Sequence, residues 1–216
     1  SPNGKELAGL VPINDRMNIA IIDLATMQPR VVTGIDKQDV NGFMWATDDR
    51  LLFFMDKDGS ESFGIFGVDA DGGNMKVLVT PAALQIKNGS SVVRITSVLD
   101  RLKSDPDNIL VTNNDRRASN PDVYKMNIRT GRKRLVMKNP GNVDGWFVDW
   151  DSNIIGAGFT DDLDGGFLMK NQETGDWEEI VKTRYDEHSF RPVAITGDGE
   201  TGYVTSNITP DGAPRD

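Results

Sequence analysis

Residues 121–136, PDVYKMNIRTGRKRLV, read as a strand, a tight turn and a returning strand. Apolar residues flank a short polar stretch, and the segment from Asn127 to Gly131 has the composition of a turn. An asparagine side chain can accept hydrogen bonds from the backbone ahead of it, and glycine takes a positive φ without steric cost. The stretch therefore predicts a β-hairpin with Gly131 in the left-handed region, where the return strand begins.

The same strand–turn–strand phrase occurs three more times, with turns at residues 23–27 (DLATM), 69–73 (DADGG) and 171–175 (NQETG). Each turn opens with Asp or Asn. All but the first have glycine at the fifth position, where the first has Met27. The opening residues are at 23, 69, 127 and 171, so successive repeats are 46, 58 and 44 residues long. A period in the forties built from strands alone is typical of a β-propeller.

The whole chain alternates Asp-rich turns with β-branched and aromatic runs, which predicts an all-β fold of seventeen strands. Grouped into four-stranded antiparallel blades, these strands form a partial β-propeller of about four and a half blades. Residues 1–216 are expected to be one propeller domain or a fragment of one. The long second repeat predicts an insertion around 81–89 and 101–107, with short helical turns conceivable at 82–86 or 103–107. The run LLFFM at 51–55 predicts a strand covered on both faces by neighbouring blades.

The composition argues against several classes of function. The net charge is −9, so neither nucleic acid nor an anionic membrane is expected as a partner, because both require a basic face. The chain has no cysteine, which excludes disulfides, thiol catalysis and Cys-ligated zinc. No signal peptide and no membrane-spanning run are recognised, and the compartment stays open between bacterial cytoplasm and periplasm. Both ends lie in turns where a further strand is expected, so we expect the chain to be part of a longer protein.

Three segments carry a resemblance to known propellers. Residues 1–8, SPNGKELA, resemble the SPDGKxLA phrase of the TolB-like and prolyl oligopeptidase families, and residues 197–204, GDGETGYV, resemble a degenerate second copy. The segment 58–73 followed by KVLVTP at 76–81 is similar to strand phrases of prolyl oligopeptidase-type propellers. The resemblance runs over nearly the whole chain. It points to the N-terminal propeller of a bacterial serine peptidase of the prolyl oligopeptidase family, of the dipeptidyl aminopeptidase or acylaminoacyl-peptidase kind.

This resemblance implies a non-catalytic domain. In the family the propeller covers a separate α/β-hydrolase domain that carries a Ser-Asp-His triad, and it limits which peptides reach that triad through its tunnel. No G-x-S-x-G occurs in the sequence, so no nucleophile is assigned and the hydrolase domain is expected downstream. The alternatives are a TolB-like protein-binding scaffold and, more weakly, a propeller hydrolase such as a lactonase with a central metal. Open blade edges also predict self-association.

No catalytic, cofactor or metal residue is assigned, although several residues were weighed. His188, the only histidine, follows Asp186 and Glu187, but neighbours on an extended strand point to opposite faces, so a structural or surface role is predicted. The acidic segments 56–61, 69–73 and 161–165 suggest calcium loops, yet none fits the EF-hand pattern, and hairpin turns are predicted instead.

Aromatic and basic residues were weighed in the same way. The four tryptophans could stack on a sugar or peptide, but Trp45 and Trp146 fall in the predicted first strands of blades, where they would fill the space between blades. The others are Trp150 and Trp177. The basic groups Arg116-Arg117 and Arg132-Lys133-Arg134 lie in or beside turns of an acidic chain, and we predict that they are solvated.

Overall fold

The computed structural model describes residues 1–57, 62–81, 85–87, 90–92, 94–184, 190–196 and 201–207. Within these ranges it consists of strands, turns and loops, with no helix. The strands are β1 (Glu6–Ile13), β2 (Arg16–Asp23), β3 (Pro29–Val31), β4 (Gly42–Trp45), β5 (Arg50–Met55), β6 (Gly64–Asp69), β7 (Lys76–Val79), β8 (Gln85–Lys87), β9 (Ser90–Val92), β10 (Thr96–Arg101), β11 (Asn108–Asn113), β12 (Asp122–Asn127), β13 (Lys133–Met137), β14 (Val143–Val148), β15 (Ile154–Asp161), β16 (Asp164–Lys170), β17 (Trp177–Arg184), β18 (Phe190–Ile195) and β19 (Gly202–Ser206).

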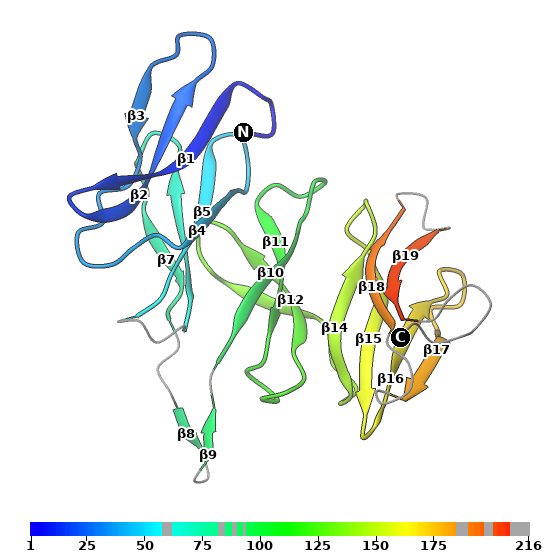
Figure 1. Ribbon diagram of the computed structural model, residues 1–216. Coiled ribbons are helices and arrows are strands. Elements are labelled where there is room, and N and C mark those ends of the chain that lie inside the picture. The colour runs from blue at the N-terminus through cyan, green and yellow to red at the C-terminus, as the bar shows by residue number, and fades with distance from the viewer. Residues whose placement is uncertain are drawn as a thin grey trace.

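Each sheet is an antiparallel meander in which every strand pairs with the next one in the chain. The sheets are β1-β2-β3, β4-β5-β6-β7, β10-β11-β12-β13, β14-β15-β16-β17 and β18-β19, with β8-β9 as a separate hairpin. Figure 1 shows the sheets following one another in chain order. The strands β10 and β14, which begin two consecutive sheets, approach each other. The predicted all-β fold of four-stranded antiparallel blades is therefore confirmed, and the described residues form a three-stranded sheet first and a two-stranded sheet last.

The insertion in the second repeat departs from the prediction in detail. Its core is the hairpin β8-β9, which projects from the rest of the molecule in Figure 1 and which the sequence did not predict. The run VVRITS predicts one strand over 92–97, and this prediction is wrong, because Val92 ends β9 and β10 begins only at Thr96. Residues 103–107 form turns rather than a helical segment. A β-branched run shows that a strand is present but does not fix where one strand ends and the next begins.

The hydrophobic core consists of three clusters, each shared by two neighbouring sheets. Alternate residues of β5 face opposite ways: Leu51, Phe53 and Met55 pack toward β2, whereas Leu52 packs toward β11 and β12. On β11, Ile109 and Val111 face back to β6, and Leu110 faces forward to β14 and β15. A middle strand buried on both faces needs apolar residues at every position, which explains the unbroken LLFFM run.

The repeated turns owe their shape to a side-chain cap. Asn127 Oδ1 accepts hydrogen bonds from the backbone N–H groups of Arg129 and Thr130, and the N–H of Gly131 donates to Asn127 O at 2.9 Å. Asp23 and Asn171 cap their turns in the same manner. The fifth residue has φ of 73° at Gly131, 80° at Gly175 and 57° at Met27. The predicted left-handed glycines are confirmed, and Met27 adopts the same conformation despite its side chain.

The turn at 69–73 is built differently. Its positive φ lies one residue earlier, at Gly72 (88°), and the N–H of Gly72 donates to Asp69 O at 2.8 Å. The turn is thus one residue tighter than the other three. The Asp69 carboxylate does not cap the turn but instead contacts Arg50 and Arg129.

Candidate functional site

In the acidic turns that the structure describes, several carboxylates already have hydrogen-bond or ion-pair partners. Burial would raise the pKa of Asp69, but hydrogen bonds from Asn74 and Arg50 lower it below its usual value. Asp161 and Asp164 face each other across the β15-β16 turn, and Asp164 forms an ion pair with Lys182 at 2.9 Å. Among the described residues, no group of three or more His, Cys, Asp or Glu could hold a metal ion. The segment 58–61, Asp186, Glu187 and His188 lie outside the described residues.

Two of the tryptophans fill space between blades, as predicted. Trp45 packs against the cluster shared by the first two sheets. Trp146 is 6% exposed, donates from Nε1 to Pro121 O at 2.8 Å, and meets Trp177 edge to face with ring centroids 6.0 Å apart. Trp150 is different, because it is 69% exposed and has Lys103 Nζ 3.1 Å from its ring centroid.

Arg116 lies at the surface, as the sequence predicted, but its side chain is only 30% exposed and holds a buried carboxylate. It forms a bidentate ion pair with Asp122, at 2.9 Å from Nε to Oδ2 and 2.6 Å from Nη2 to Oδ1, and also donates to Asn139 O. The Asp122 side chain is fully buried at the start of β12. Burial would raise the pKa of Asp122, but hydrogen bonds from Arg116 and from Asn139 N lower it below its usual value.

In the other basic group, residues 132–134, Lys133 forms an ion pair with Asp115 at 2.6 Å, and Arg132 and Arg134 are exposed.

A buried arginine joins two neighbouring blades. Arg50, at the start of β5, is 1% exposed. Its Nε donates to Ile128 O of the next blade at 2.9 Å, and its Nη1 lies 2.5 Å from Asp69 Oδ1. Arg129 reaches Asp69 at 3.1 Å from its turn in that next blade. Arg50, which no sequence pattern marked, therefore ties the second and third sheets together.

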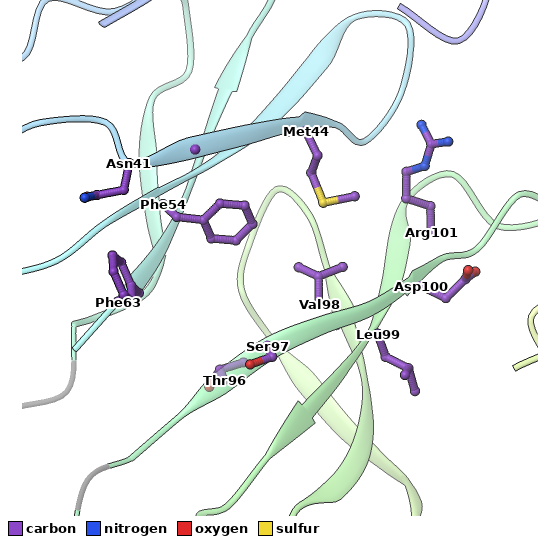
Figure 2. Close-up of a pocket in the computed structure, with 11 residues that line it drawn as sticks. Asn41, Met44, Phe54, Phe63, Thr96, Ser97, Val98, Leu99, Asp100 and Arg101 are labelled. Atoms are coloured by element: carbon purple, nitrogen blue, oxygen red, sulfur yellow. The ribbon is translucent and has the colours of Figure 1, made fainter. Parts of the chain in front are cut away.

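A cavity of about 680 Å³ lies between β4 and β10. In a propeller the blades surround a central channel, and β4 and β10 are the first strands of neighbouring blades. Figure 2 shows the side chains of Met44, Phe54 and Val98 directed into the space between these strands. Asn41 and Phe63 lie toward one end and Arg101 toward the other. The volume is within the range usual for small-ligand sites.

The strand β10 is irregular at this cavity. Its pairing with β11 shifts register between Val98 and Asp100, so Leu99 is an extra residue in the ladder. Such bulges turn a strand and redirect its side chains. Beyond the bulge, Asp100 Oδ1 accepts a hydrogen bond from Ser152 Oγ of the next blade at 2.5 Å, and Arg101 donates to Trp45 O of the preceding blade at 3.0 Å. The sequence predicted an insertion around 101–107, and no periodic pattern marked Asp100 or Arg101 as strand residues.

The geometry defines the chain as a partial β-propeller with a cavity between its inner strands, and comparison with known proteins bears out this class. The comparison also identifies a protein with a similar sequence. The chain is 28% identical over 210 residues to dipeptidyl aminopeptidase BIII from Pseudoxanthomonas mexicana, which covers 96% of this chain. The chain spans only 29% of the length of that relative. No family model matches.

Solved structures give the same fold. A candidate dipeptidyl aminopeptidase IV from Bacteroides ovatus superimposes with a TM-score of 0.62 at 13% identity, covering 96% of this chain and 36% of that one. TolB from Acinetobacter baumannii superimposes with a TM-score of 0.51 at 18% identity, covering 98% of this chain and 50% of that one. The resemblance to propellers of dipeptidyl aminopeptidases and of TolB is therefore confirmed. No helix among the described residues is long and apolar enough to cross a membrane.

Proposed function

We propose that the chain is the non-catalytic propeller domain of a serine peptidase of the prolyl oligopeptidase family. The observation that carries this proposal is the sequence similarity to a dipeptidyl aminopeptidase along 96% of the chain, without any G-x-S-x-G motif. The domain would then restrict which peptides reach a hydrolase domain elsewhere in the same protein, and it would provide a surface on which that domain docks.

The first test of this proposal is enzymatic. Fluorogenic prolyl and alanyl dipeptide substrates should show no turnover above buffer with residues 1–216. The longer parent protein should cleave them, with a rate abolished by a serine-directed inhibitor. Turnover by residues 1–216 that the same inhibitor removes would overturn the non-catalytic assignment.

A second measurement separates gating from docking. Gating predicts that the parent protein's kcat/KM falls steeply once peptides exceed a limiting length, because a channel admits only slender substrates. Docking predicts that residues 1–216 and the separately expressed hydrolase domain associate when mixed, as seen by calorimetry. A rate independent of peptide length removes the gating role, and absence of association removes the docking role.

The alternative is a protein-binding propeller of the TolB kind, which the superposition on TolB favours. In that case the reading frame after Asp216 would encode further propeller repeats and no hydrolase motif. Affinity purification from a bacterial lysate would recover one protein in a fixed ratio to the chain. A downstream G-x-S-x-G followed by Asp and His would decide against this alternative.

A further inference from the structure

We propose that the cavity between β4 and β10 binds one bulky apolar side chain of an extended peptide. The proposal rests on the proposed function only for the class of ligand, a peptide. The site itself is argued from the side chains that line the cavity, from the backbone at its two sides, and from the room beside Gly42.

The lining of the cavity suits an apolar group. The side chains of Met44, Phe54 and Val98 are half-buried and belong to the cluster shared by the second and third sheets, so the cavity continues that hydrophobic core toward the channel. Phe63, which is 42% exposed, adds a further apolar surface at one end. A leucine or phenylalanine side chain placed here would remove its own apolar surface and that of the lining from water. Methionine also adapts its shape to different partners.

The backbone on either side of the cavity can hold an extended chain. Among the described strands, β4 pairs only with β5 and β10 only with β11, so each sheet ends at the strand that borders the cavity. One edge of each strand therefore carries N–H and C=O groups without a strand partner, and an added peptide strand binds through such groups. The bulge at Leu99 interrupts the regular ladder at this place. Ser97 is exposed and Asn41 lies at the end of the cavity, which adds polar groups at its border.

The position of Gly42 offers a way to close the cavity without disturbing the fold. Gly42 lines the cavity, and a Cβ there would come no closer to another group than 3.9 Å, from Phe54 Cδ2. Its φ lies outside the left-handed region, so a larger residue fits the strand. Gly42→Leu should therefore fill the space that the peptide side chain would occupy. Gly9, on β1 in another sheet, has no atom within 4 Å of such a Cβ, which makes Gly9→Leu the matched control.

The experiment is a titration followed by NMR of methyl-labelled methionines in residues 1–216, with the Met44 methyl signal assigned through Met44→Leu. The probes are blocked pentapeptides, acetyl-Gly-Gly-Xaa-Gly-Gly-amide, with Leu, Phe, Ala or Lys in the centre. The Leu and Phe peptides should shift the Met44 signal in a saturable way, with dissociation constants on the order of 1 mM, because one side chain and a few hydrogen bonds must offset the entropy of association. The Ala and Lys peptides should bind at least about 10-fold more weakly, because they cannot fill an apolar cavity.

The variants complete the test. Gly42→Leu should weaken binding of the Leu peptide at least about 10-fold, and Gly9→Leu should leave it unchanged. Val98→Thr, which keeps the shape but adds a hydroxyl, should weaken it several-fold and serves if Gly42→Leu does not fold.

Three outcomes would overturn the inference: equal shifts with the Ala and Leu peptides, no saturable shift with any peptide, or unchanged binding in both Gly42→Leu and Val98→Thr. A Met44 signal that moves with protein concentration in the absence of peptide would also overturn it, since a second copy of the chain would then occupy the cavity. Peptide cleavage by the parent protein is measured separately. Failure of peptide binding at the cavity can therefore be distinguished from failure of the proposed function.

Discussion

The glycines that close the repeated turns differ in what surrounds them. Gly131 and Gly175 have nearly the same positive φ, but a Cβ at Gly131 would lie 2.5 Å from Leu78 O of the neighbouring blade, whereas Gly175 has nothing within 4 Å. Gly131→Val should therefore lower the free energy of unfolding by about 3 kcal/mol and Gly175→Val by about 1 kcal/mol, because only the first adds a clash to the backbone strain. Urea denaturation measures both, and equal losses would contradict the prediction.

Met27 provides the converse experiment at the same position of the repeat. It holds a φ of 57° and its side chain is 65% exposed, so its conformation is strained and its packing contributes little. Met27→Gly should raise the free energy of unfolding by about 0.5–1 kcal/mol, since glycine adopts this region without steric cost. Thermal melts of the two proteins decide the point, and a lowered midpoint would show that the methionine side chain contributes more than the strain costs.

The carboxylate of Asp122 makes stability depend on pH. Its pKa is lowered in the folded protein from the ordinary value of 3.8, so the ion pair with Arg116 stabilises the fold fully above that value. This contribution is lost as the pH falls through the lower, folded-state pKa. The reason is that the unfolded chain, in which the carboxyl has the higher pKa, binds the proton more tightly than the folded protein does. Asp122→Asn should be less stable at pH 7 and should lose less stability between pH 5 and pH 2. Parallel pH profiles for the two proteins would contradict this.

Between elements, Arg50 is the contact whose loss should matter most. Removing it leaves Ile128 O without its donor and opens a void at the start of β5. Arg50→Ala should lower the free energy of unfolding by about 3 kcal/mol. Arg129→Ala is the control, because Arg129 also reaches Asp69 but its side chain is 44% exposed, so its loss should cost less than about 1 kcal/mol. Urea denaturation should show a larger loss of unfolding free energy for Arg50→Ala than for Arg129→Ala. The reverse result would mean that the exposed Arg129, and not the buried Arg50, provides the main contact between the two sheets.

Strands and turns were predictable where the residues that determine them are adjacent in sequence or where a strand is buried on both faces. The LLFFM run and the capped turns contain their own signals, since the residues that decide them are adjacent in sequence. The end of β10 was not predictable, because Asp100 and Arg101 are strand residues only by virtue of partners in two other blades. The contacts of two arginines escaped prediction for the same reason: Arg116 and Arg50 resemble other charged residues near turns until the fold brings Asp122 and Ile128 beside them.

The candidate site was predictable only in outline. The sequence predicted that Trp45 and Trp146 lie on the first strands of blades and fill the space between blades, and the structure places both there. It did not indicate the cavity, because this depends on the bulge at Leu99 and on the separation of β4 and β10. No local sequence pattern encodes the bulge or the separation of the two strands. A bulge arises where one strand adjusts to its partner, so the residues of one strand alone do not determine it.

For the whole molecule, the exposed strands at the two ends of the described chain predict self-association. Among the described strands β1 pairs with β2 and β19 with β18, and all residues of β19 are exposed, with Tyr203 60% and Val204 44% exposed. The mass of residues 1–216 measured by light scattering should rise with concentration, because an open edge can pair with another chain. Tyr203→Lys should reduce this association, and Met27→Lys, in a turn, should not. A monomer at all concentrations, with a sharp reversible melt, would contradict the prediction.

The sharing of every hydrophobic cluster by two sheets has a consequence for how such a chain can evolve. Ile65 and Met126 belong to one cluster although they come from different repeats, while Phe66 lies against the other neighbour. A change in size at Ile65 must therefore be compensated in the next repeat rather than beside it in the sequence. Selection therefore acts on the hydrophobic contact between two neighbouring repeats rather than on one repeat alone. A duplication of one full period copies the residues for both sides of such a contact.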